Sequence, residues 1–349
     1  MDVASPWRFP ALPFPKLAPG SAMTNHPSLR MNTGLPGVAG VAAVVSLRSC
    51  GKRKPIAMRG VQYSDRLSMG GRPASLWSPG SGGEELSSYR YTFSTRKLAL
   101  STLGFPLGSK LEIELPRELL NMEVPVVQSR AVVLVHGLLC SRLDMAHFAE
   151  ELVLRGFTVL APEMDDSVSH EDGVVPGGFV GSLLAREEAE ERRLQVLQDC
   201  VDWLRQHGAK DVGLVGHSRG GVTISQLEGD FCRVNIAGFQ PPPVDPEDTF
   251  RKGAEGPMLI ICGAEDEICT RPPLSMDYVQ DTVRRLRPGA ESFYPAGVTH
   301  FNLLNPQVVE SWQSLLGAVG AWAPAPEPAA ANLISQKVAD FLDSKMNKG

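Results

Sequence analysis

The feature that most constrains this chain is an apolar segment that runs into a glycine-rich turn and then into a helix-compatible stretch. Residues 212–215 read Val-Gly-Leu-Val, residues 216–221 read Gly-His-Ser-Arg-Gly-Gly, and residues 222–227 read Val-Thr-Ile-Ser-Gln-Leu. This order matches the pattern G-x-S-x-G and predicts a buried strand, a sharp turn and a helix, with Ser218 at the turn. Glycines beside the serine remove side chains that would clash there, and the helix N-terminus favours negative charge next to it.

Apolar and amphipathic segments alternate along most of the chain. Continuous apolar runs are typical of parallel strands covered on both faces, and amphipathic stretches such as 145–155 and 185–207 are typical of the covering helices. The alternation predicts an α/β fold with a largely parallel, doubly wound sheet and helices on both faces. Buried strands are predicted at residues 131–135, 157–161, 212–215, 234–239, 258–262 and 292–294, and half-buried strands at 89–93 and 111–115.

The N-terminal segment differs in charge from the rest. Eight lysines and arginines and no acidic residue lie between Asp2 and Asp65. Such a stretch is typical of an organellar transit peptide, so residues 1–60 are predicted to be a transit peptide or a disordered extension. We expect a plastid or mitochondrial location, or otherwise a cytoplasmic one. The remaining divisions are a linker at 61–86, a catalytic domain at 87–322, a Pro/Ala linker at 323–331 and a C-terminal helix at 332–349.

Composition excludes several classes of function. The formal net charge of −5 argues against a basic surface for nucleic acid, and no apolar segment is long enough to span a bilayer comfortably. Among the six cysteines there is no CxxC pair and no zinc-like spacing. Cys140 and Cys262 adjoin or lie within apolar runs, so we expect small buried side chains there rather than disulfides.

The other groups of a serine-based site are expected after Ser218 in chain order. His300 is the only histidine that follows, and it lies in a loop-like stretch after the last predicted strand. A neutral imidazole there can take the serine proton and return it to a leaving alcohol. Asp266 follows the strand at 258–262, where a carboxylate can orient that histidine, while Asp245 follows the preceding strand and remains the alternative acid.

Two backbone N–H groups are needed to bind the negative oxygen that forms during acyl transfer. One is predicted to be that of Arg219, directly after the serine. The other is predicted to be that of Leu138, since Gly137 lets the backbone approach the site. The side chain of His136 is expected to stabilise this loop by hydrogen bonding rather than to act on substrate.

Charged residues near the predicted site are expected to have structural roles. Glu265 and Glu267 are expected to be solvated neighbours of Asp266. The side chain of Arg219 is expected to pair with Asp165 or Asp166 rather than to bind a substrate carboxylate. A serine triad needs no metal, so we expect no metal and no cofactor, and four residues that lack ligand spacing are rejected as metal ligands: His136, His217, Asp165 and Asp166.

Together these residues resemble the α/β-hydrolase superfamily over residues 89–322. The resemblance lies in the oxyanion strand and loop, the serine turn, the acid turn and the histidine loop, at residues 132–139, 216–221, 263–266 and 298–301. Within the superfamily, Val-His-Gly at 135–137, Arg-Gly-Phe-Thr-Val-Leu-Ala-Pro at 155–162 and Gly-His-Ser-Arg-Gly-Gly at 216–221 are similar to chlorophyllases, platelet-activating-factor acetylhydrolases and cutinase-like polyesterases. The first two groups resemble a design with the acid at Asp245, whereas the turn at Asp266 resembles the polyesterases.

The resemblance implies a serine hydrolase that cleaves a carboxylic ester through an acyl-enzyme and needs no cofactor. The substrate is expected to be a small or lipid-like ester. The segment from residue 237 to 258 is too short for a large cap domain, so we expect a rather open site, with the loop at 165–184 as a potential cover. The alternatives are a chlorophyllase-type hydrolase in the plastid, an acyltransferase, and a non-catalytic binding protein of the same fold. The oligomeric state does not follow from the sequence.

Overall fold

The computed structural model describes residues 56–81, 83–97, 110–169, 186–239, 250, 254–270, 274–318 and 325–346, which all belong to one compact unit, Val44–Gly349. Residues 1–55 of the predicted transit segment, the alternative acid Asp245 and most of the loop at 165–184 lie outside the described residues. The location, the alternative acid and the role of that loop therefore stay predictions.

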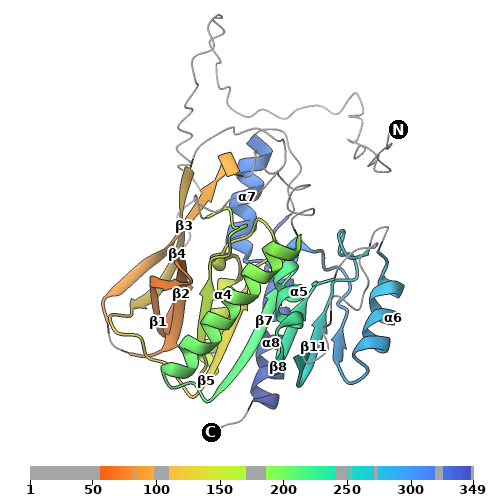
Figure 1. Cartoon of the computed structure of the whole chain (residues 1–349). Helices are drawn as coiled ribbons and strands as arrows, with labels where there is room; N and C mark the ends of the chain where they lie inside the picture. The colour runs from red at the N-terminus through yellow and green to blue at the C-terminus, as the bar shows by residue number, and fades with distance from the viewer. Residues whose placement is uncertain are drawn as a thin grey trace, which may run out of the picture. The chain divides into compact units, whose positions relative to one another are not determined.

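One mixed sheet organises the described part of the chain, with the strand order β12-β11-β9-β7-β5-β6-β2-β1-β4-β3 (Figure 1). From β12 to β6 every neighbouring pair is parallel, whereas β2 is antiparallel to both β6 and β1. A separate parallel pair joins β8 and β10. The bounds are β1 Ile56–Met69, β2 Arg72–Pro79, β3 Glu85–Ser94, β4 Lys110–Asn121, β5 Arg130–Val135, β6 Thr158–Pro162, β7 Asp211–His217, β8 Gly229–Asp230, β9 Arg233–Ile236, β10 Ala254–Glu255, β11 Met258–Ile261 and β12 Glu291–Phe293.

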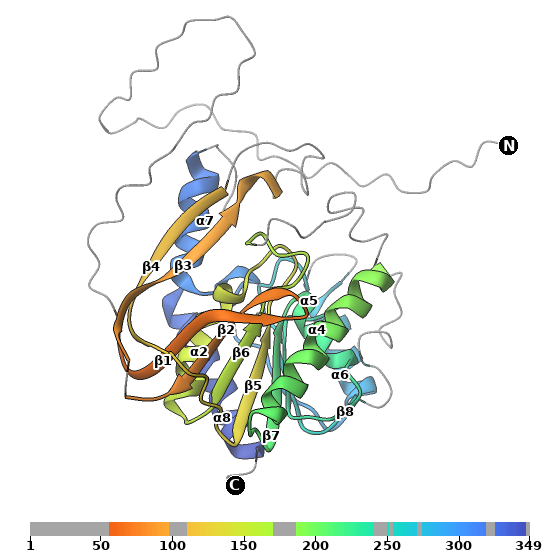
Figure 2. The ribbon, with the colours of Figure 1, turned by 60° about the vertical axis from the view of Figure 1, so that its left-hand side comes forward.

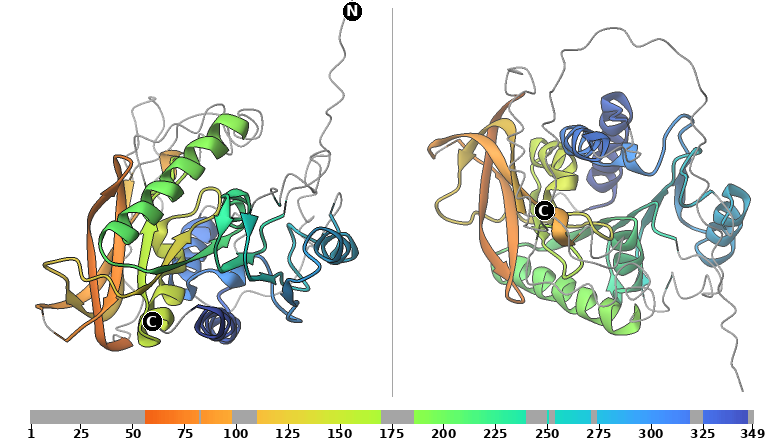
Figure 3. Two further views of the ribbon diagram at one scale, coloured as in Figure 1. Left: turned by 60° about the horizontal axis from the view of Figure 1, so that its bottom comes forward. Right: turned by 90° about the horizontal axis from the view of Figure 1, so that it is seen from above.

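Helices cover both faces of the parallel part, as Figure 3 shows. Alternation along β5 explains this: Ala131 and Val133 belong to the apolar cluster under α4, while Val132 and Leu134 belong to the cluster under α2 and α8. The predicted α/β fold is therefore confirmed. The bounds are η1 Arg142–Met145, α2 Ala146–Leu154, α4 Arg186–Gln206, α5 Arg219–Gln226, α6 Met276–Leu286, η3 Phe301–Leu303, α7 Pro306–Ala318 and α8 Pro328–Lys345.

The prediction of a linker at residues 61–86 is wrong. Strands β1 and β2 occupy this segment and extend the sheet (Figure 2). Val61 and Trp77, one in each strand, are fully buried. The two strands meet at Gly70 and Gly71, whose φ angles of 56° and 80° are readily adopted only by glycine. A Gly-Gly pair between two alternating segments is a hairpin signal, and it gives the sheet an earlier start than residue 87.

The predicted C-terminal helix packs on the body of the fold. Helix α8 begins at Pro328, earlier than expected, and Val338, Phe341 and Leu342 are buried in the same cluster as α2. Between β9 and β11 the described residues contain the short strand β10 and no helix. Among the described helices, none is both long and apolar enough to cross a membrane.

Candidate active site

Ser218 lies at the junction of β7 and α5 in a strained backbone conformation. Its φ of 54° and ψ of −122° are rare for a residue with a side chain, and its N–H donates to the carbonyl oxygen of Ile236 at 2.7 Å. The neighbouring glycines are sterically required. A Cβ on Gly216 would lie 2.2 Å from the carbonyl oxygen of Gly220, and one on Gly220 would lie 2.0 Å from that of Val135. The turn therefore presents Ser218 at the carboxyl end of the sheet, as the sequence predicts.

His300 and Asp266 form a buried pair beside this turn. His300 Nδ1 donates to Asp266 Oδ2 at 2.8 Å, and the two residues are 3% and 0% exposed. The other carboxylate oxygen accepts the backbone N–H groups of Ile268 at 2.9 Å and Cys269 at 2.7 Å. Burial alone would raise the pKa of Asp266, but the charge of His300 and these hydrogen bonds outweigh burial and lower it. The aspartate is thus held ionised and oriented toward the imidazole.

Glu267 holds the backbone of His300, contrary to the expectation that it is merely solvated. Its Oε2 accepts the N–H of His300 at 3.0 Å, and its Oε1 is buried. Its neighbour Glu265 is exposed, as expected. The turn that carries Asp266 therefore contacts His300 twice, once at the ring and once at the main chain.

The described residues contain no hydrogen bond between Ser218 Oγ and His300 Nε2. The two residues are nevertheless brought together, because the ring of His217, next to Ser218, lies 4.7 Å from the ring of His300. Long or misaligned contacts between a nucleophile and its base are common in unliganded enzymes and tighten when substrate binds. Ser218 itself is partly exposed, which suits a residue that must meet a substrate.

The loop after β5 closes on the serine turn from the other side. A Cβ on Gly137 would lie 3.0 Å from that of Ser218, so this glycine permits the close approach. Met164 N–H donates to His136 Nε2 at 2.9 Å, and burial lowers the pKa of this imidazole, so the hydrogen resides on Nδ1. Nδ1 donates to the carbonyl oxygen of Gly137 at 2.7 Å. Because C=O and N–H point in opposite directions across a trans peptide, this bond directs the N–H of Leu138 away from His136.

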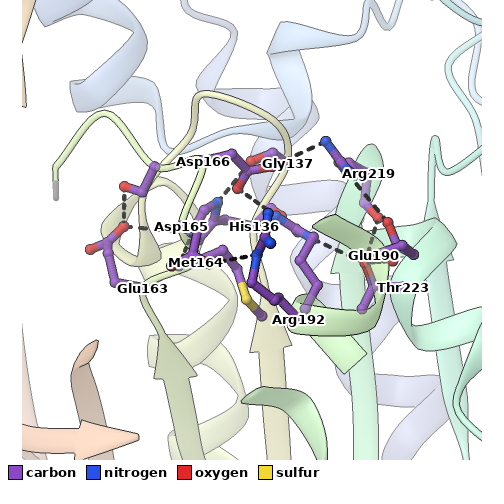
Figure 4. A network of polar contacts seen from close by, with 12 residues as sticks. His136, Gly137, Glu163, Met164, Asp165, Asp166, Glu190, Arg192, Arg219 and Thr223 are labelled. Carbon is purple, nitrogen blue, oxygen red and sulfur yellow. Dashed lines mark hydrogen bonds and ion pairs between the residues drawn. The ribbon is translucent and has the colours of Figure 1, made fainter. Parts of the chain in front are cut away.

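A network of hydrogen bonds and ion pairs joins this loop to neighbouring elements (Figure 4). Arg193, on α4, donates to the carbonyl oxygen of His136, to Asp166 at 2.6 Å and to Thr223 at 3.0 Å. The side chain of Arg219 pairs with Asp166 at 3.5 Å, as predicted, and also with Glu190 at 3.3 Å. Its charge is therefore compensated within the protein. The role of Arg193 was not predicted, because nothing in its local sequence marks it.

The four residues rejected as metal ligands do not form a ligand cluster among the described residues. A different group does: Cys262, Asp266 and Cys269 bring one potential ligand atom each to within 4.8 Å of one another. Asp266 already binds His300, and contact with the Cys262 thiol together with burial raises the pKa of the Cys269 thiol well above its usual value. A Cys269 thiol that keeps its proton does not favour a cation. As predicted, Cys140 and Cys262 are buried and free of disulfides.

The sequence profile of the Dienelactone hydrolase family matches residues 119–300, more than half of the chain. The chain belongs to the dienelactone hydrolase family. The matched region runs from the end of β4 to His300, so it includes the loop after β5, the Ser218 turn and Asp266. Membership makes this α/β-hydrolase-fold protein a hydrolase, whereas the narrower resemblance to chlorophyllases and acetylhydrolases stays a prediction.

Solved structures similar to this dienelactone hydrolase family member include three with hydrolytic activity in their titles. One is a ferulic acid esterase from Streptomyces cinnamoneus, with 18% identity and a TM-score of 0.49 over 82% of this chain and 89% of that chain. A dienelactone hydrolase-like promiscuous phosphotriesterase from metagenomic libraries has 16% identity and a TM-score of 0.47, and the match covers 76% of this chain and 100% of that chain. An esterase from Pyrococcus furiosus has 14% identity and a TM-score of 0.42, and the match covers 77% of this chain and 98% of that chain. No curated protein sequence matches the chain.

Proposed function

We propose that this protein is a serine esterase that cleaves a carboxylic ester through an acyl-enzyme. Ser218 is the nucleophile, His300 the general base and acid, and Asp266 the carboxylate that orients His300. The backbone N–H groups of Leu138 and Arg219 bind the oxygen that becomes negative. The observation that carries the proposal is the buried 2.8 Å hydrogen bond between His300 and Asp266 beside the strained Ser218 turn.

The chemistry follows from the roles of these groups. Ser218 Oγ attacks the ester carbonyl carbon while His300 Nε2 takes the hydroxyl proton, and Asp266 stabilises the resulting imidazolium. Collapse of the tetrahedral intermediate expels the alcohol, which receives that proton from His300. Water then attacks the acyl-enzyme with His300 again as base, which releases the acid and restores Ser218. The developing oxyanion lies near the N-terminus of α5, whose dipole favours negative charge.

The Asp266 turn favours this residue as the acid over Asp245. Its Oδ2 already accepts from His300, and backbone N–H groups hold the other oxygen. A carboxylate held in this way keeps the imidazole in the tautomer that exposes Nε2 to the serine. Parallel replacement of Asp266 and Asp245 by asparagine tests the choice, since the residue that can be replaced without loss of activity is not the acid.

The first test is labelling of the full-length protein with a fluorophosphonate, followed by mass spectrometry of the adduct. We expect modification at Ser218, and its loss in His300→Ala. Ser218→Ala should lower kcat on p-nitrophenyl esters on the order of 10⁶-fold if the three residues act as a unit. A folded protein that is neither labelled nor hydrolytic would favour a binding role instead. Esters and acceptor alcohols supplied together would reveal acyl transfer, and chlorophyll as substrate would test the chlorophyllase alternative.

A further inference from the structure

His217 lies between the three parts of the candidate site. It is the last residue of β7 and directly precedes Ser218, and its side chain is 1% exposed. Its Nε2 lies 3.3 Å from the carbonyl oxygen of His300, and the two imidazole rings are 4.7 Å apart at an angle of 47°. On its other side it faces the oxyanion loop, since a Cβ on Gly137 would lie 3.3 Å from His217 Nδ1.

The contacts of His217 define which nitrogen carries its hydrogen. A carbonyl oxygen can only accept, so Nε2 must be the donor in the contact with His300. Burial, together with the neighbouring charge of His300, lowers the pKa of His217 well below its usual value, so the ring is neutral. Nδ1 then keeps a lone pair, and among the described residues it has no hydrogen-bond partner. The ring is thus committed to one contact, that with the main chain of His300.

We propose that His217 is a positioning residue for the ester hydrolysis, because its Nε2–H fixes the main chain of the base His300 relative to the adjacent nucleophile Ser218. This inference rests on the proposed function. One peptide bond separates His217 from Ser218, so a hydrogen bond from its ring to His300 ties the base to the serine turn. Among the described residues, no direct hydrogen bond between Ser218 and His300 performs this task.

The main chain of His300 is then held at both its N–H group and its carbonyl oxygen. Glu267 accepts its N–H at 3.0 Å and His217 faces its carbonyl oxygen at 3.3 Å, while Asp266 holds the ring. The ring of His217 also packs against that of His300 without adding a charge. A neutral neighbour matters here, since a cation beside His300 would oppose the imidazolium that forms when the serine proton is taken.

Two substitutions separate the hydrogen bond made by His217 Nε2 from the packing of the imidazole ring. In His217→Gln the side-chain amide nitrogen can occupy the place of Nε2, whereas in His217→Asn it reaches only the place of Nδ1. We expect His217→Asn to lose about 10–100-fold in kcat with unchanged KM, since a base displaced by an ångström can cost about that much. His217→Gln should keep most of the wild-type kcat. The rate constant of fluorophosphonate labelling at Ser218 should fall in parallel, and melting temperatures should be alike.

Two results would overturn the positioning role: wild-type kcat in a folded His217→Asn, or equal losses in both variants. If a variant does not fold, ¹⁵N NMR of the wild-type imidazoles decides, because the inference requires the hydrogen of His217 on Nε2 and a hydrogen on Nδ1 contradicts it. Failure of the wild type to label at Ser218 overturns the proposed function itself. Normal labelling of the wild type and an equally fast His217→Asn overturns only the role of His217.

Discussion

Two turns of the described structure each contain a carboxylate with no exposure to solvent. Asp266 lies in the turn after β11, and Asp144 lies in η1, after the oxyanion loop. Asp266 accepts two backbone N–H groups and His300, and its pKa is lowered despite burial. Asp144 accepts the N–H of Ser141 at 2.8 Å and contacts the side chains of Tyr91 and Cys140, but it has no cationic partner among the described contacts, and burial raises its pKa to about 7. Burial raises the pKa of a carboxylate, and only at Asp266 do the facing histidine and the hydrogen bonds to the carboxylate outweigh it.

The largest expected effect tests whether Asp266, whose pKa is lowered, is the carboxylate that acts in catalysis. Asp266→Asn should lower kcat about 10⁴-fold, because the amide stabilises the wrong tautomer of the base and cannot compensate an imidazolium. Asp144→Asn is the matched control: it makes the same change in an equally buried side chain that contacts no histidine among the described residues, and it should leave kcat close to wild type. Steady-state kinetics on one p-nitrophenyl ester compares them. Comparable losses in both variants would contradict the division of roles between the turns.

Asp166 sharpens the comparison, because it is a carboxylate on the oxyanion side that does have cationic partners. Arg193 pairs with it at 2.6 Å and is 3% exposed. Removing one member of a buried pair leaves an uncompensated charge, so Arg193→Gln should destabilise the fold by about 3–5 kcal/mol. The adjacent Arg192 is 44% exposed and meets Asp165 at 3.3 Å, so Arg192→Gln should cost at most about 1 kcal/mol.

Urea unfolding measures both variants, and a cost for Arg193→Gln no larger than for Arg192→Gln would be evidence against the network. Because Arg193 also donates to the carbonyl oxygen of His136, kcat of the folded Arg193→Gln should fall as well. Arg192 makes no contact with the oxyanion loop among the described contacts, so its variant should retain wild-type kcat.

Opposite pKa shifts in the two turns predict opposite pH dependences of stability. Asp144, whose pKa is raised to about 7, binds its proton more tightly when folded, so its stabilisation is complete in acid and is lost as pH rises toward 7. Its contribution to the free energy of unfolding should fall by about 1.4 kcal/mol per pH unit between pH 5 and 7. The pKa of Asp266 is lowered by folding, so its ionised form stabilises the folded state at any pH above the pKa of the unfolded chain. This stabilisation is lost only in stronger acid, as pH falls toward the folded pKa.

Asp266 stays ionised in both states between pH 5 and 7, so the difference between wild type and Asp144→Asn isolates Asp144. Urea unfolding at pH 5, 6 and 7 should give a wild-type stability that declines relative to the variant. A difference that stays constant over this range would mean that Asp144 is ionised when folded, and that the contrast between the turns is wrong.

Local sequence signals are sufficient to predict the strand, turn and helix around Ser218. The apolar runs and the Gly-x-Ser-x-Gly pattern predict β7, the Ser218 turn and α5, because each depends on residues adjacent in the chain. The uniqueness of His300 after Ser218 and the position of Asp266 after β11 predict that these residues meet, and the 2.8 Å contact bears out this juxtaposition. Their catalytic roles remain proposals.

What the sequence could not predict depends on contacts between distant segments. Arg193 reaches the carbonyl oxygen of His136, 57 positions away, and no local pattern on an exposed-looking charged helix marks this residue. Strands β1 and β2 were missed because a polar, glycine-containing stretch resembles a linker until β6 pairs with it. The raised pKa of Asp144 likewise follows from burial under surrounding elements and not from its neighbours in sequence.

The smallest effect concerns the second contact between the Asp266 turn and His300. Glu267 accepts the N–H of His300 at 3.0 Å, while Glu265, two residues away in the same turn, is exposed. Loss of one hydrogen bond to a charged acceptor corresponds to about 1.5–3 kcal/mol at most, so Glu267→Ala should lower kcat modestly, by about tenfold, and Glu265→Ala should not change it. Glu267→Gln keeps an acceptor oxygen and should recover most of the loss. Equal kcat values for Glu267→Ala and Glu265→Ala would show that the contact between Glu267 and the main-chain N–H of His300 contributes nothing to catalysis.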